Sequence, residues 1–175
     1  DPGKIGVDNV KEKDVNLQIA LCLKAQLQAR GVKVILTREG DVCLATNGAT
    51  NKKVSDMHNR VSLINASSAD YMISIHQNSY PEAEISGPQV FYYGSSEMSK
   101  KLAEAIQAQL IADLQPPKER EIKTGNDLYI LKNSQCPGVI VECGFLSNPT
   151  ECENLQNPQY QQAVAAAIAR AICKL

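Results

Sequence analysis

Several features that would place a chain in a familiar class are missing from these 175 residues. No apolar run approaches the roughly 20 residues that span a bilayer, so we expect no transmembrane segment. The net charge is −1 and there is no long basic run, so nothing predicts a nucleic-acid partner. A signal peptide is also missing, because Asp1-Pro2-Gly3 is typical of the interior of a turn. We therefore expect the N-terminus to have been cut.

The six cysteines match no metal-binding or redox motif. Their spacings include neither a CxxC pair nor a zinc-knuckle pattern; they stand at positions 22, 43, 136, 143, 152 and 173. A chain of this length forms a hydrophobic core without disulfide staples. We expect most of the cysteines to be reduced.

Helical and extended patterns alternate along the chain, whose composition of 43% hydrophobic and 21% charged residues is typical of one globular domain. Apolar spacing predicts helices over 14–30, 54–66, 97–114 and 159–173. Short β-branched or apolar runs predict strands over 32–37, 71–76, 89–93, 128–131 and 138–142. Strands that are apolar on both faces predict an α/β fold, with a mainly parallel twisted sheet flanked by helices on both faces.

Chemically capable side chains end two of these strands. His76 closes the run YMISIH and Glu142 closes GVIVE. Ligands of parallel sheets bind beyond the carboxyl ends of the strands, and Glu12, just before the first helix, could face the same edge. Each residue also has a structural explanation: His76 as a hydrogen-bonded edge residue, Glu142 paired with a lysine or arginine, and Glu12 solvated in a first helical turn. These patterns predict a site without naming its reaction.

Three stretches carry a resemblance that does name one. EKDVNL (12–17), SIHQN (74–78) and VECGFLSN (141–148) resemble successive motifs of the N-acetylmuramoyl-L-alanine amidases of the third amidase family, and the similarity runs from Asp1 to Leu175. The resemblance implies hydrolysis of the amide bond between N-acetylmuramic acid and L-alanine in peptidoglycan. QNS after His76 resembles the spore-cortex branch, which implies a role in spore cortex maturation and export to the cell wall or spore envelope. Regulation by a partner protein is common in this family.

The family holds one Zn²⁺ with histidine, glutamate and histidine. The resemblance implies that Glu12 and His76 are the second and third ligands and that Glu142 is the catalytic glutamate. Three protein ligands leave a fourth position open, as in catalytic rather than structural zinc sites. A carboxylate near the metal then takes a proton from water and passes it to the leaving amine.

The family's first ligand is a histidine in an Asp-x-Gly-His-Gly-Gly motif that follows the first strand. The segment from Asp1 to Gly6 resembles the stretch immediately after that motif. We therefore expect 1–175 to be a single amidase catalytic domain from which the N-terminal strand and the first histidine ligand are missing. The other histidine, His58, is expected on the surface of a helix.

Two other functions stay open. Cys143 could be the nucleophile of a metal-free cysteine hydrolase with His76 as its base, although neighbouring residues of a strand face opposite ways. The chain could also be a non-catalytic peptidoglycan-binding or regulatory domain. For a polymeric substrate we expect a shallow groove bordered by 38–53, 78–88 and 126–132, with Asn78 and Leu128 as substrate contacts.

Overall fold

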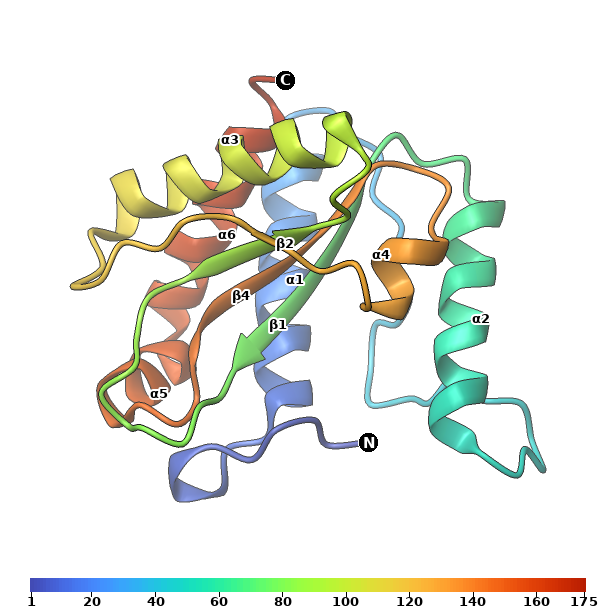
Figure 1. Cartoon of the computed structure of the whole chain (residues 1–175), viewed down its shortest axis with the longest axis horizontal. Coiled ribbons are helices and arrows are strands. Elements are labelled where there is room, and N and C mark those ends of the chain that lie inside the picture. Colours follow the sequence, from blue (N-terminus) through green and yellow to red (C-terminus); the bar gives the residue numbers. More distant parts are fainter.

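A four-stranded sheet in the order β1-β4-β2-β3 lies at the centre of the computed structural model, which describes residues 1–175 (Figure 1). β1 (Met72–Asn78) pairs in parallel with β4 (Gly138–Phe145). β2 (Gln89–Tyr92) is antiparallel to β4 and parallel to the two-residue β3 (Lys123–Thr124). The predicted mainly parallel α/β fold is confirmed, with the β2–β4 pair as its antiparallel junction.

Six α-helices and one 3-10 turn surround the sheet: η1 (Val7–Asn9), α1 (Glu12–Gln28), α2 (Lys52–Ala66), α3 (Glu97–Leu114), α4 (Tyr129–Asn133), α5 (Pro149–Gln156) and α6 (Pro158–Ile172). Polar side chains start four of them, because a free oxygen there accepts from the unpaired N–H groups of the first turn; the caps are Asn51, Ser96, Asn148 and Asn157. None of the helices combines the length and apolarity needed to cross a membrane.

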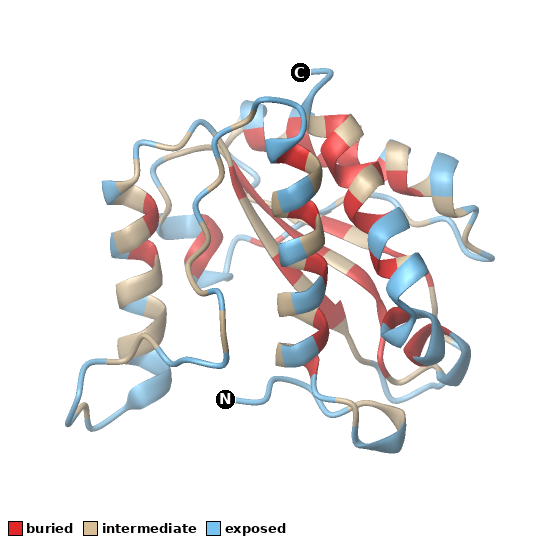
Figure 2. Ribbon diagram, turned by 180° about the vertical axis from the view of Figure 1, so that it is seen from behind, coloured by how far each residue is buried: buried red, intermediate tan, exposed pale blue.

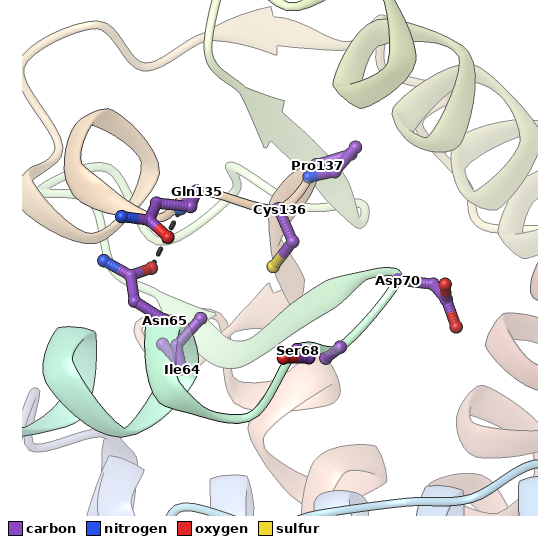
Figure 3. A pocket seen from close by; sticks show the side chains of 8 residues that line it. Ile64, Asn65, Ser68, Asp70, Gln135, Cys136 and Pro137 are labelled. Carbon is purple, nitrogen blue, oxygen red and sulfur yellow. Dashed lines mark hydrogen bonds between the residues drawn. The ribbon is translucent and has the colours of Figure 1, made fainter.

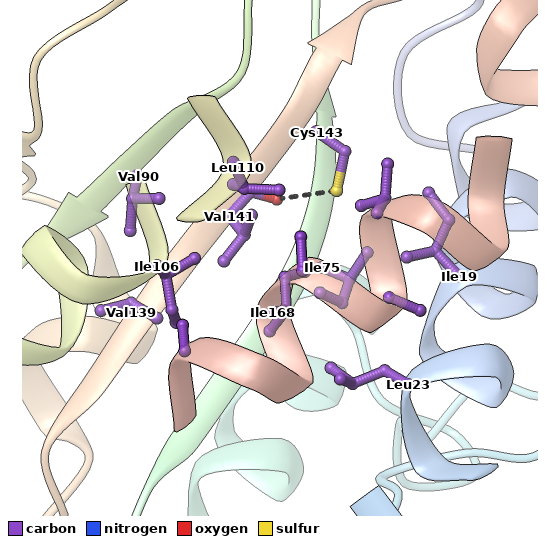
Figure 4. Close-up of a cluster of buried hydrophobic side chains, with 14 of the residues drawn as sticks. Ile19, Leu23, Ile75, Val90, Ile106, Leu110, Val139, Val141, Cys143 and Ile168 are labelled. Atoms are coloured by element: carbon purple, nitrogen blue, oxygen red, sulfur yellow. Dashed lines mark hydrogen bonds between the residues drawn. The ribbon is translucent and has the colours of Figure 1, made fainter. Parts of the chain in front are cut away.

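Side chains that alternate along the strands pack into two separate hydrophobic cores, one on each face of the sheet. Ile75, Val139 and Val141 point to the face covered by α1, α3 and α6, where the larger cluster forms (Figure 4). Met72 and Ile140 point to the other face and pack with α2 and α4. Seen from behind, the buried residues of the large helices form stripes turned toward the sheet (Figure 2). Helices on both faces therefore follow from strands that are apolar on both sides.

Two predicted strands are wrong. Residues 32–37 pair with no strand, and the edge strand β1 has its ladder with β4 alone. Val32 and Val34 are instead partly buried by packing against the larger core. Residues 128–131 enter helix α4, closed by the bond from Lys132 N–H to Leu128 O. This apolar stretch joins no strand and satisfies its backbone hydrogen bonds within the helical turn.

Packing on the larger core predicts a large cost for truncating α6. Ile168 is 0% exposed, whereas Ile35 is 49% exposed. Ile168→Ala is expected to lower the free energy of unfolding by about 2–5 kcal/mol, because it leaves a cavity. The matched change Ile35→Ala is expected to cost less than about 1 kcal/mol. Urea unfolding of both variants measures the difference, and equal losses would contradict this assignment of the core.

Candidate active site

His76 and Glu142 stand next to each other on neighbouring strands. They are register partners in the parallel β1–β4 ladder, so their side chains lie on the same face of the sheet, the face of Met72 and Ile140. The register shifts immediately beyond this pair, where Asn78 is opposite Phe145. A bulge next to a pair of polar groups is typical of functional sites, since it re-aims side chains at the strand end.

Glu12, the first residue of α1, reaches this pair from 64 positions earlier in the chain. Its Oε1 lies 2.8 Å from His76 Nδ1 and also accepts the backbone N–H of Gln77 at 3.3 Å. Its other oxygen, Oε2, accepts the backbone N–H of Lys4 at 2.8 Å. The carboxylate is buried, and the carboxyl edge of the sheet brings together the three residues that sequence reasoning selected.

The two carboxylates of the site have opposite electrostatic surroundings. Burial raises the pKa of Glu142 to about 7, Glu12 adds to the rise and His76 opposes it. The Oε2 of Glu142 is buried without a hydrogen-bond partner. Burial also raises the pKa of Glu12, but hydrogen bonds from His76 and the Lys4 backbone outweigh it and bring the value to about 2. Glu12 therefore stays ionised, while Glu142 exchanges a proton readily near neutral pH.

The imidazole of His76 is the third titratable group. Burial lowers its pKa, but the hydrogen bond with Glu12 and the charge of Glu142 outweigh burial and raise it. Its side chain is 41% exposed, so the site is open to solvent on the histidine side.

Only two side chains converge closely enough to share a cation. A carboxylate oxygen and an imidazole nitrogen 2.8 Å apart are donors that Zn²⁺ accepts, and they fit as two of its ligands. No group of three or more histidine, cysteine, aspartate or glutamate side chains is arranged to hold a metal. The Oε2 of Glu142 has no hydrogen-bond donor within the protein, and a water molecule bound in the site would donate to it.

Cys143 is turned away from these groups. It follows Glu142 within β4, so it faces the larger core, where its thiol is 0% exposed and donates to Val141 O (Figure 4). Burial raises the pKa of this thiol far above its usual range, and the charge of Glu142 adds to the rise. A neutral thiol on the opposite face from His76 cannot act as its nucleophile, which argues against the cysteine-hydrolase alternative.

Asn78 and Leu128, the two predicted substrate contacts, lie apart from the hydrogen bonds of the site. Asn78 ends β1 two residues after His76, and its Oδ1 accepts the N–H of Ser79. Leu128 precedes α4 and is 38% exposed. Neither position is tied by a hydrogen bond to the three site residues, so substrate contact stays a prediction for both. His58 is exposed on α2, as expected, and its ring stacks on Tyr129 at 5.2 Å.

A hollow of about 300 Å³ opens at the other end of the same strands (Figure 3). Asp70 and Pro137, which precede β1 and β4, line it together with Asn65 at the end of α2, and the N–H of Gln135 donates to Asn65 Oδ1. Because it lies at the amino ends of the strands, this hollow is not the groove expected beside the loops 38–53 and 78–88. That groove stays a prediction.

Asn16 and Gln77 are two residues of the site that sequence reasoning missed. Both stand within the quoted motifs, and Asn16 donates to Glu12 Oε1 at 3.2 Å. The i,i+4 spacing of Glu12 and Asn16 on a predicted helix was a usable signal, because such residues share one face.

Comparison with known proteins gives consistent matches over nearly the whole chain. Residues 1–174 match the family model described as N-acetylmuramoyl-L-alanine amidase. The germination-specific N-acetylmuramoyl-L-alanine amidase of Bacillus subtilis is 40% identical over 183 residues, which cover 99% of this chain and 77% of that protein. The CwlD amidase of Clostridioides difficile, solved in complex with the GerS lipoprotein, superposes with a TM-score of 0.95 at 37% identity over 99% of this chain and 91% of that one. The amidase AmiC2 of Nostoc punctiforme gives 0.86 at 30% identity over 99% and 89%.

Differences in burial among the six free cysteines predict their order of alkylation. Cys43 and Cys173 are exposed, whereas Cys143 and Cys152 are buried. Under native conditions a thiol reagent is expected to label the exposed pair first and Cys143 only after unfolding, because Cys143 is both buried and neutral. Peptide mass spectrometry over a time course reads out each site. Labelling of Cys143 at the rate of Cys43 would restore the cysteine-hydrolase alternative.

Proposed function

The chain belongs to the family of N-acetylmuramoyl-L-alanine amidases, and on this premise we propose that it uses one Zn²⁺ to cleave peptidoglycan in the spore cortex. The bond that is hydrolysed joins the lactyl carbonyl of N-acetylmuramic acid to the amino group of L-alanine. The cortex assignment is supported by the names of two similar proteins, a germination-specific and a sporulation-specific amidase of Bacillus subtilis.

Glu12 and His76 are the proposed zinc ligands of this chain. The observation that carries the proposal is the 2.8 Å approach of Glu12 Oε1 to His76 Nδ1, next to a glutamate that has a buried oxygen without a partner. When bound, zinc supplies Lewis-acid chemistry, which polarises the scissile carbonyl and makes water a better nucleophile. An ionised Glu12 and a half-exposed imidazole suit that role, because a cation binds deprotonated ligands.

Glu142 is the proposed general base and acid. Its carboxylate takes a proton from the attacking water as the new C–O bond forms at the lactyl carbonyl. When the C–N bond breaks, the same group gives that proton to the leaving amino group of L-alanine, so the glutamate ends as it began. A carboxyl whose pKa is about 7 is matched to both halves of this transfer at neutral pH.

The substrate is a long glycan strand with peptide stems, and we propose that it lies along the carboxyl edge of the sheet. Asn78 would contact it because it follows His76 on the same strand and face. Leu128 would offer an exposed apolar side chain at the start of α4.

We also propose that a partner protein regulates this chain and that this chain acts outside the cell. The similar amidase of Clostridioides difficile was solved in complex with a lipoprotein, which supports a protein partner for this chain. Two relatives are described as cell wall amidases, which supports action at the cell wall or spore envelope after export.

Glu142→Gln tests the proposed base. The amide is nearly isosteric but cannot accept the proton, so turnover of peptidoglycan is expected to fall about 100-fold or more. Zinc content and the unfolding midpoint are expected to stay near those of the unchanged chain. Glu104→Gln, on the exposed side of α3, is the matched control and is expected to keep full turnover.

Measuring zinc and turnover on the same Glu142→Gln sample separates three roles. A ligand role would lower zinc content together with activity, and a packing role would change neither strongly. Hydrolysis at the unchanged rate would show that Glu142 is not the base.

Chelation tests the metal. A zinc chelator is expected to abolish release of stem peptides from purified peptidoglycan, and added Zn²⁺ is expected to restore it, because the nucleophile depends on the cation. Alkylation of the exposed Cys43 serves as the control and is expected to have little effect. Full hydrolysis by protein that elemental analysis shows to be metal-free would refute the zinc mechanism.

A further inference from the structure

Two side-chain amides lie in series behind the Glu12 carboxylate. Asn16, one turn further along α1, donates its Nδ2–H to Glu12 Oε1 at 3.2 Å. Gln77, the neighbour of His76 on β1, donates its Nε2–H to Asn16 Oδ1 at 3.2 Å. The chain of bonds therefore runs from β1 through Asn16 to the oxygen that faces His76.

This order fixes which end of each amide faces which partner. An asparagine side chain has an NH2 donor at one end and a carbonyl acceptor at the other, and only the donor end suits a carboxylate. Because Gln77 donates a hydrogen bond to Asn16 Oδ1, the Nδ2 group of Asn16 is left to face Glu12. A reversed Asn16 would set its oxygen against the carboxylate oxygen and its NH2 group against the NH2 group of Gln77, two donor or acceptor clashes.

Gln77 sits in this position although its surroundings are unfavourable. It is 2% exposed, on the side of β1 that faces the larger core beside the Cys143 thiol. Its Oε1 is buried and accepts no hydrogen bond. An apolar side chain of the same size would avoid that desolvation cost, so an amide at this position calls for a role outside core packing.

The second oxygen of Glu12 is held independently. Oε2 accepts the N–H of Lys4, and Gly3 crosses the carboxylate with a φ of +72°, where a side chain would collide with Glu12. The N-terminal segment thus holds Oε2, while Oε1 is held by the Asn16 amide and by the backbone N–H of Gln77.

We propose that Asn16 and Gln77 are positioning residues, a two-amide relay that aligns Glu12 Oε1 with His76 before the metal binds. The inference rests on the proposed function, because alignment of Glu12 matters for its role as a zinc ligand. Groups that hold a ligand from outside the coordination sphere set its orientation, and their loss typically weakens metal binding about 10–100-fold.

The relay is tested on the whole chain with Asn16→Leu, Gln77→Met and the double variant, using Zn²⁺ alone as the probe. Chelator competition measures the zinc dissociation constant, crystal structures show the position of Glu12, and thermal melting reports folding. We expect Asn16→Leu to weaken zinc binding about 10-fold or more and to release Glu12 Oε1 from His76. Gln77→Met is expected to act in the same direction with a smaller loss. Asn16→Ala replaces the leucine variant if leucine prevents folding.

The double variant gives the most specific test of the relay, because the losses of zinc affinity are expected not to add. The Gln77 side chain reaches Glu12 through Asn16, so Gln77→Met is expected to add no further loss of zinc affinity once Asn16 is leucine. Gln18→Leu is the matched control, since it removes another amide–amide bond of α1, the one from Gln161 Nε2 to Gln18 Oε1, at 2.7 Å. That variant is expected to bind zinc within about twofold of the unchanged chain.

Three outcomes separate the relay from the proposed function. Single variants that bind zinc normally with Glu12 in place overturn the relay, as does a double variant whose loss is the product of the single losses. If Glu12 shifts in the variants while the unchanged chain itself binds no Zn²⁺, the relay is upheld and the zinc mechanism fails.

Discussion

The parallel ladder between β1 and β4 is the constraint on which the candidate site depends. It places His76 opposite Glu142, and the alternation of side chains along both strands puts the two groups on one face. The same ladder directs Ile75 and Val141 to the other face, where they bury the apolar sides of α1 and α6. Packing of α1 on that core sets the position of its first turn and so of Glu12. Core formation and site assembly are consequences of one register.

The two carboxyl groups of the site, Glu12 and Glu142, have pKa values that their neighbours shift in opposite directions. Glu12 accepts hydrogen bonds from Lys4, Asn16, Gln77 and His76, and these favour its charged form. Glu142 is partly buried, and its Oε2 is fully buried without a partner, which favours the neutral form. Opposite environments for two acids are a general way of obtaining a permanent anion and an exchangeable proton in one cleft.

Sequence patterns predicted the elements whose periodicity is strong and whose burial is complete. Helix α3 was predicted with its observed bounds, and β1 and β4 were predicted because an apolar run flanked by polar residues suits a buried strand. The segment 32–37 has the same local character but no partner, and β3 is a strand only because β2 lies beside it. Pairing is a tertiary property that local preference does not contain.

In the candidate site too, local patterns predicted some residues, while contacts made only in the folded chain could not be predicted from them. Strand ends pointed to His76 and Glu142 on physical grounds, whereas the meeting of Glu12 with His76 was expected from resemblance alone, since 64 positions separate them. The sequence did not predict Asn16 and Gln77 as site residues, because only the folded structure shows which partner each amide group faces. The bulge after Glu142 takes up one extra residue of β4 on the carboxyl side of the His76–Glu142 pair. Deleting one residue of β4 before Glu142 would bring Cys143 opposite His76 and exchange an acid for a thiol. Beyond the bulge the chain enters the larger core at Leu146, which is 0% exposed, so a residue gained or lost there would disturb packing instead of the pairing of His76 with Glu142.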